Sequence, residues 1–135
     1  MLTDTGPLVA LLDKKDSQHA ACRAVLGRLP RGPLLTTWPC FTEAMYLLNL
    51  VGGHRYQNTL WQWRRDGRLI LLDLSPAETD RMEALMAQYP NVPMDLADSS
   101  LVAIAESRGY RRLFTTDSDF YIYRLPDGSV LEVVR

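Results

Sequence analysis

Short apolar runs alternate with longer segments of helical periodicity along most of the chain. The runs at 34–37, 68–74 and 111–116 are bounded by turn residues or helical segments, which is typical of strands in a buried sheet. The run at 1–4 predicts a very short first strand. Between the runs, apolar residues recur at intervals of three and four positions and predict helices at 6–16, 16–29, 39–51, 54–67, 75–89 and 95–109.

Local signals mark the ends of several of these helices. Ser75 with Glu78 three residues later is a capping-box pattern, and either Asp16 or Ser17 is positioned to cap the second helix. Gly109 predicts the end of the helix at 95–109, because glycine readily adopts the left-handed conformation that closes many helices. Each signal agrees with the element boundary that the apolar periodicity predicts.

The C-terminal tail has a different pattern. Residues 121–134 predict two short strands around a turn at Asp127–Gly128. Before the tail, strands alternate with helices of about ten or more residues, which implies crossover connections and a mainly parallel sheet. The predicted fold class is therefore α/β, with a working crevice at the carboxyl ends of the strands.

Composition narrows the class of protein only slightly. The 135 residues suffice for one domain, 1–135, and 47% hydrophobic with 23% charged residues is ordinary for a globular protein. A net charge of −1 gives no overall basic field that would attract nucleic acid. Cys22 and Cys40 lack metal-site spacing and are expected to be buried thiols. No signal peptide or membrane-spanning run is recognisable, which predicts a cytoplasmic protein without a membrane partner.

Acidic residues follow two of the predicted strands. Asp4 comes directly after the first strand, and Asp117 comes directly after the run at 111–116. Because both strands are expected to be parallel, we expect both carboxylates at the same edge of the sheet. Each aspartate taken alone also fits an ordinary turn or helix cap.

Two further acids fall on apolar faces of predicted helices. The residues three and four positions from Glu43 are apolar, and an acid there is costly unless it is paired or bound to a cation. Asp98 heads an apolar helix face in the same way. The alternatives are that Glu43 reaches solvent or pairs with an arginine, and that Asp95 caps the helix with Asp98 in its first turn.

These four acids, Asp4, Glu43, Asp98 and Asp117, are expected to converge on one crevice. Clustered carboxylates repel one another unless a cation neutralises them. A set of oxygen ligands without His or Cys suits Mg²⁺ or Mn²⁺ better than zinc. Such sites polarise a phosphate and activate a water, so hydrolysis of a phosphodiester bond is the chemistry that this set fits best.

Four segments of the chain, taken in order, resemble a known family: LTDTGPLVALLD, TTWPCFTEAMYLL, MDLADSSLVAIAE and LFTTDSDF. Together they resemble a PIN domain and, within that group, the VapC toxins of bacterial toxin–antitoxin pairs. The resemblance covers essentially the whole chain. It implies a three-layer α/β/α sandwich around a mainly parallel sheet, and an endoribonuclease that depends on Mg²⁺ or Mn²⁺.

The resemblance also implies roles for the acids by position. The four acids of the family fall on Asp4, Glu43, Asp98 and Asp117. Asp4 and Asp98 are then the most direct metal ligands. Glu43 and Asp117 complete the ligand shell or orient the attacking water.

Other polar residues near these positions are accessory candidates. Asp95 lies one helical turn before Asp98 and leaves the assignment of the third acid ambiguous. Asp119 is a second accessory acid. Either Thr115 or Thr116 is expected to hydrogen-bond a ligand carboxylate.

The resemblance further implies an RNA substrate, a homodimer and a small antitoxin that fills the acidic groove. Arg64, Arg65 and Arg68 are candidates to bind RNA phosphates, and nearby tryptophans are candidates to stack on unpaired bases. Trp61 is expected to pack in the core, whereas the arginines stay open between RNA contacts and a solvated face. Two other functions stay open: a PIN-like RNA- or protein-binding module without turnover, and a nuclease that acts on DNA.

Overall fold

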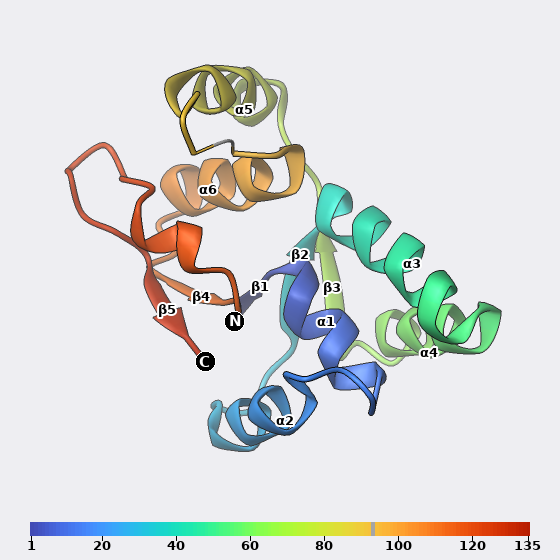
Figure 1. The fold of residues 1–135 in the computed structure, drawn as a ribbon. Coiled ribbons are helices and arrows are strands. Elements are labelled where there is room, and N and C mark those ends of the chain that lie inside the picture. Colours follow the sequence, from blue (N-terminus) through green and yellow to red (C-terminus); the bar gives the residue numbers. More distant parts are fainter. Residues whose placement is uncertain (93) are drawn as a thin grey trace.

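A parallel sheet forms the centre of the protein (Figure 1). The computed structural model describes residues 1–92 and 94–135. Every neighbouring pair of strands in this part of the chain is parallel, so the predicted α/β class is confirmed. In their order across the sheet the strands are β3 (Leu69–Leu72), β2 (Leu34–Thr37), β1 (Leu2–Thr3), β4 (Arg112–Phe114) and β5 (Glu132–Val134).

Helices connect successive strands as the alternating pattern predicts. β1 is followed by two helices, β2 by two, and β3 by two, while a short 3₁₀ helix follows β4. The bounds differ from the predicted ones by a few residues, the largest change being the first helix, which ends at Leu12. The helices are α1 (Thr5–Leu12), α2 (His19–Arg28), α3 (Trp38–Gly52), α4 (His54–Arg65), α5 (Pro76–Gln88), α6 (Leu96–Arg108) and η1 (Ser118–Tyr121).

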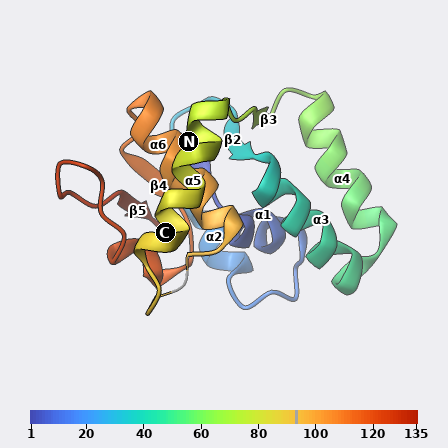
Figure 2. The same cartoon turned by 90° about the horizontal axis from the view of Figure 1, so that it is seen from above.

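Two hydrophobic cores lie on opposite faces of the sheet. Leu85 of α5 and Leu101 of α6 pack on one face together with Leu113 of β4. On the other face, Leu48 of α3 packs with side chains of α1, α2 and α4 and with Phe114 of β4. Successive side chains of a strand point to opposite faces, so neighbouring Leu113 and Phe114 serve different cores. Figures 1 and 2 show α5 and α6 on one side of the sheet and α1, α3 and α4 on the other, which makes three layers.

Helix starts depend on the capping residues that the sequence supplies. The capping box at α5 is confirmed, because Ser75 and Glu78 each accept a hydrogen bond from the backbone of the other. α6 ends at Gly109, whose φ of 74° is the expected left-handed conformation. The predicted cap of α2 is wrong: α2 starts at His19 after Gln18, and neither Asp16 nor Ser17 caps it. Asp16 instead accepts a hydrogen bond from the backbone of Gln18, which closes a turn before the helix.

The tail prediction is half wrong. The turn at Asp127–Gly128 is confirmed, since Gly128 has a φ of 84° and its N–H bonds to the Leu125 carbonyl. The first of the two predicted strands is absent from the described residues, and only β5 forms. Tyr123 and Leu125 are buried in a core, so their alternation reflects burial without strand pairing. β5 pairs with β4 in parallel, as an added edge strand.

Over residues 1–92 and 94–135, no helix combines the length and the hydrophobicity that a membrane crossing requires. Both cysteines, Cys22 and Cys40, are buried free thiols, as predicted.

Candidate active site

Three carboxylates from distant segments meet at the carboxyl edge of the sheet. Asp4 follows β1, Asp117 lies shortly after β4, and Asp98 lies in the first turn of α6. One oxygen of each lies within 4.8 Å of the others, close enough for all three to bind one metal ion. Asp4 and Asp98 are each only 7% exposed, whereas Asp117 is half-buried. The structure therefore brings together three of the four acids that the sequence places in the crevice.

Asp4 is held in one orientation by hydrogen bonds to both carboxylate oxygens. The Thr5 N–H donates to its Oδ1 and the Thr115 hydroxyl donates to its Oδ2, each at 2.7 Å. Thr115 Oγ1 in turn accepts a hydrogen bond from the Asp117 N–H at 3.0 Å. This buried threonine therefore positions two of the three acids, and the predicted hydrogen bond from Thr115 to a carboxylate is confirmed.

Thr116, the alternative to Thr115, has a different surrounding. It lies against Gly6 at the start of α1, where an added Cβ would be 2.7 Å from the Thr116 hydroxyl. Only a residue without a Cβ lets the segment after β4 approach α1 this closely. Gly6 therefore helps to bring Asp117 beside Asp4.

Asp98 and Asp95 have separate positions, although both lie at the start of α6. Asp95 is exposed and caps the helix, with its Oδ1 accepting the Asp98 N–H at 2.7 Å. The buried Asp98 carboxylate accepts a hydrogen bond from the Tyr123 hydroxyl at 3.2 Å. Sequence reasoning did not identify Tyr123. The alternating pattern of the tail did indicate that Tyr123 is buried, but the pattern was assigned to a strand, so the contact with α6 was not predicted.

Glu43 lies at the margin of the cluster. It is half-buried on α3 and does not belong to the group of oxygens within 4.8 Å. The prediction that Glu43 lies on a buried apolar face of its helix is wrong in part, because Tyr46 and Val51 on that face are 65% and 52% exposed. Burial, together with the charges of Asp95 and Asp4, raises the pKa of the Glu43 carboxyl. Glu43 is therefore close enough to the cluster for the charge of Asp4 to affect its pKa.

The remaining candidates lie outside the cluster. The Asp119 N–H donates to Asp117 Oδ1 at 2.9 Å, so the backbone of Asp119 positions a neighbouring acid. Arg64, Arg65 and Arg68 are exposed at the end of α4 and before β3. β3 is separated from β1 by β2, so the structure does not bring these arginines to the acids. Trp61, expected in the core, is 37% exposed and packs edge to face on Phe41 with ring centroids 4.9 Å apart.

The surroundings make ionisation of the buried acids unfavourable. Burial raises the pKa of Asp4 to about 6, although the hydrogen bonds from Thr115 and Thr5 oppose the shift. Burial raises the pKa of Asp98 to about 8, with further contributions from the charges of Asp95, Asp4 and Asp117. Burial raises the pKa of the Tyr123 hydroxyl, and the charge of Asp98 adds to the shift.

No basic side chain compensates these charges in the described part of the chain. The ion pairs within residues 1–92 and 94–135 all use acids outside the cluster, namely Asp66, Glu78, Glu106, Asp127 and Glu132. Buried carboxylates without a basic partner are stable as anions only when a cation joins them. The three oxygens suit a hard divalent ion, so this cluster is a candidate metal site.

The size of a cavity does not identify this site. A cavity of about 630 Å³ lies at the opposite, amino-terminal edge of the sheet, between the end of α2 and the starts of β2 and β4. None of the acids of the cluster lines it. The chemistry of the side chains, rather than the volume of the space, therefore points to the carboxyl edge.

Solved structures of low sequence identity share this fold. The Mycobacterium tuberculosis toxin VapC20, described as cleaving the sarcin–ricin loop, is 17% identical, with a TM-score of 0.82 over 90% of this chain and 92% of that one. A toxin–antitoxin complex from Klebsiella pneumoniae is 18% identical, with a TM-score of 0.64 over 99% and 95% of the chains. VapBC2 from Rickettsia felis, bound to a DNA fragment from its promoter, is 16% identical, with a TM-score of 0.68 over 99% and 98%.

Sequence comparison gives two results. A comparison with curated proteins finds no significant match. The family described as PIN domain matches residues 1–125, a span that contains Asp4, Glu43, Asp98 and Asp117. The match agrees with the four segments that resemble this family and with the fold shared with VapC toxins. The chain therefore belongs to the PIN domain family.

Proposed function

We propose that this protein is a divalent-metal-dependent endoribonuclease and the toxin of a VapBC-type toxin–antitoxin pair. The observation that carries the proposal is the cluster of three carboxylates at the carboxyl edge of the sheet, two of them buried and none with a basic partner among residues 1–92 and 94–135. Membership of the PIN domain family and the fold shared with VapC toxins support the same function.

In this proposal Asp4, Asp98 and Asp117 hold the ion, which is Mg²⁺ or Mn²⁺. Their all-oxygen donor set fits such ions. The raised pKa values of Asp4 and Asp98 and the short distances between the three carboxylates indicate that a cation would stabilise their charged forms. Asp98 rather than Asp95 is the ligand, because the Asp95 carboxylate is exposed and accepts the Asp98 N–H. Asp95, Asp119 and Thr115 are positioning residues that act through their hydrogen bonds to the ligand acids.

The chemistry is hydrolysis of an RNA phosphodiester bond. When bound, the ion polarises the scissile phosphate and lowers the pKa of the attacking water. The oxygen of that water bonds to phosphorus, the bond to the leaving oxygen breaks, and the leaving oxygen takes a proton from solvent. Glu43 takes up the proton of the water, since its pKa is raised and it lies at the margin of the cluster. Thr115 keeps Asp4 oriented throughout, and Tyr123 does the same for Asp98.

The partners follow from the same assignment. A cognate antitoxin is supported by the two fold neighbours that are described as toxin–antitoxin assemblies. An RNA substrate, a homodimer and action in the cytoplasm follow from the resemblance to VapC toxins. Arg64, Arg65 and Arg68 stay candidates for RNA phosphates, at a distance from the acids.

The test is cleavage of defined RNAs by the purified, antitoxin-free protein with Mn²⁺ or Mg²⁺. We expect cleavage that EDTA and Asp98→Asn abolish and that Asp95→Asn retains, because asparagine still caps α6. DNA of the same sequence serves as the competing substrate. A folded protein that binds no divalent ion would contradict the proposal and favour the alternative, a PIN-like RNA- or protein-binding module without turnover.

A further inference from the structure

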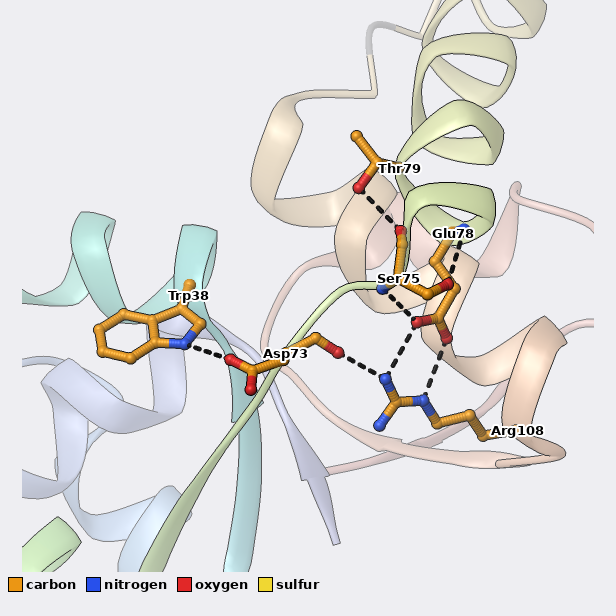
Figure 3. Close-up of polar contacts among 6 residues, drawn as sticks. All are labelled: Trp38, Asp73, Ser75, Glu78, Thr79 and Arg108. Carbon is orange, nitrogen blue, oxygen red and sulfur yellow. Dashed lines mark hydrogen bonds and ion pairs between the residues drawn. The ribbon is translucent and has the colours of Figure 1, made fainter.

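Trp38 is an exposed aromatic side chain that is nevertheless held in place. It begins α3 directly after β2 and is 43% exposed. Its indole N–H donates to Asp73 Oδ1 at 3.0 Å, and its ring packs edge to face on Phe41 with centroids 5.7 Å apart. The hydrogen bond to Asp73 (Figure 3) and the contact with the Phe41 ring together restrain the orientation of this exposed indole.

A hydrogen-bond network around the buried Glu78 holds the backbone of Asp73 in place. Arg108 of α6 donates to the backbone carbonyl of Asp73, and its guanidinium also makes two hydrogen bonds of 3.0 Å to the Glu78 carboxylate. Glu78 is 4% exposed and completes the capping box with Ser75. Figure 3 shows how this chain of contacts runs from α6 and α5 through Asp73 to Trp38. The loop that holds the indole is therefore tied to two helices.

A groove opens beside this indole along the edge strand β3. Its volume is about 430 Å³, and its walls are Trp38, Asp73, residues 69–71 of β3, and Gly67 with two arginines of α4, Arg64 and Arg65. Both arginines are exposed, and Arg65 uses one nitrogen to bond Gln62 at 2.8 Å. Two positive charges face one carboxylate, one of whose oxygens already accepts the indole N–H. The groove thus combines an aromatic surface with a net positive charge.

Of the residues that line the groove, Trp38 is the nearest to the acid cluster in the order of the strands. Trp38 follows β2, and Asp4 follows the neighbouring strand β1. Adjacent strands lie about 4.8 Å apart, so the backbone at Trp38 lies one strand from that at Asp4 on the carboxyl edge, while the indole reaches toward Asp73 at the end of β3. A polymer that lies in the groove can therefore extend to the acids.

We propose that this groove binds a single-stranded segment of the RNA substrate, with one base stacked on Trp38 and the adjoining phosphates on Arg64 and Arg65. The inference rests on the proposed function, since it names where the substrate of the acid cluster lies. A nucleic acid fits better than an extended peptide added to β3, because stacking surfaces and arginines are what single strands require. Trp38 selects an unpaired base, and Asp73 is its positioning residue.

The test measures binding apart from cleavage. Fluorescence anisotropy of a labelled, unstructured RNA is measured in EDTA with the full-length chain carrying Asp98→Asn, which prevents turnover. We expect Trp38→Ala to weaken binding about tenfold, since stacking of one base carries an effect of that order. Trp38→Phe keeps a ring and loses less, which separates stacking from a folding defect. Tyr46→Ala is the matched control, because Tyr46 is an exposed aromatic residue of α3 outside the groove.

Two further comparisons locate the contacts. The double change Arg64→Ala with Arg65→Ala is expected to lower affinity for every RNA and to reduce the slope of log affinity against log salt by about 1.4, since each phosphate contact on a single strand contributes about 0.7. A scan with single abasic nucleotides is expected to find one position where the loss equals that of Trp38→Ala and does not add to it. That position is the base that stacks on the indole.

The outcomes separate this inference from the proposed function. Equal RNA affinity of the Trp38→Ala and Tyr46→Ala proteins, or no RNA binding at all, would overturn the inference. So would a Trp38→Ala protein that binds RNA normally and an antitoxin weakly, because the groove would then be a protein site. Binding that depends on Trp38 without any metal-dependent cleavage would instead overturn the proposed function and leave the groove in place.

Discussion

Two buried acids occupy the same position on neighbouring helices and have opposite properties. Asp98 is the third residue of α6 after its cap Asp95, and Glu78 is the third residue of α5 after its cap Ser75. Both carboxylates are almost inaccessible, at 7% and 4% exposure. Burial and a helix N-terminus are therefore common to both acids, and neither accounts for the difference between them.

The difference comes from their partners. Glu78 bonds back to the Ser75 N–H and pairs with Arg108, whose hydrogen bonds lower the pKa of Glu78 to about 2. Asp98 faces other carboxylates, and burial together with their charges raises its pKa to about 8. Glu78 thus stabilises the fold as an anion, whereas Asp98 destabilises it as an anion until a cation binds. A buried acid indicates a functional site only when its basic partner is missing.

The largest effect is expected from isosteric amides at these matched positions. Asp98→Asn is expected to lower the cleavage rate about a thousandfold, because it removes a ligand of an ion that contributes several kcal/mol to the transition state. Glu78→Gln is expected to change the rate at saturating RNA by less than tenfold. Single-turnover cleavage with Mn²⁺ and calorimetric titration of Mn²⁺ measure both. Equal losses of Mn²⁺ affinity in the two variants would break the comparison.

A smaller effect is expected when the basic partner is removed. Arg108→Ala leaves the Glu78 carboxylate buried without its cation and is expected to lower the free energy of unfolding by about 3 kcal/mol. Arg111→Ala is the matched control, since the Arg111–Asp127 ion pair is exposed and is expected to contribute less than about 1 kcal/mol. Urea unfolding measures both values. Similar midpoints for the two variants would show that the pair at Glu78 is not structural.

The third prediction concerns pH in the absence of metal. The folded-state pKa values of Asp4 and Asp98, about 6 and about 8, lie above the ordinary value of 3.8. The folded protein therefore binds more protons than the unfolded chain over this range. In EDTA, stability is expected to be highest below about pH 4 as far as these two groups are concerned, and to fall as pH rises through 6 and 8. Glu78 has the opposite shift and loses its contribution only as pH falls toward about 2.

Asp98→Asn isolates that contribution. At pH 8 in EDTA the variant is expected to be more stable than the unmodified protein by about 2 kcal/mol, because the neutral amide avoids the repulsion. Excess Mn²⁺ is expected to stabilise the unmodified protein and to remove most of the difference. Thermal unfolding from pH 5 to pH 8 measures these changes. A melting temperature in EDTA that stays constant over this range would contradict the raised pKa values.

The comparison also shows what the sequence can predict. The capping box at Ser75 and Glu78 and the glycine stop at Gly109 are local patterns, and both were predicted correctly. The parallel sheet followed from strand and helix alternation, and the convergence of Asp4 with Asp117 followed from the sheet. These features depend on spacing along the chain, which the sequence displays directly.

Contacts between distant segments were harder to predict. Nothing in the local pattern distinguishes Glu78 from Asp98, because Arg108 reaches Glu78 across 30 positions and Tyr123 reaches Asp98 across 25. Trp38 and Asp73 meet only because β2 and β3 are neighbours in the sheet. The partner of a buried charge is thus a property of the packing, and its identity required the structure.

The smallest effect is expected from the two caps. Ser75→Ala and Asp95→Ala each remove the side chain that accepts a helix N–H, and each is expected to cost about 1 kcal/mol of stability at pH 5. At pH 8 in EDTA, Asp95→Ala is expected to cost a few tenths of a kcal/mol less than Ser75→Ala, on the order of a helix charge interaction. The reason is that removing Asp95 also removes a negative charge that raises the pKa of Asp98. Urea unfolding at both pH values measures the difference, and equal costs at pH 8 would mean that Asp95 acts on Asp98 only as a cap.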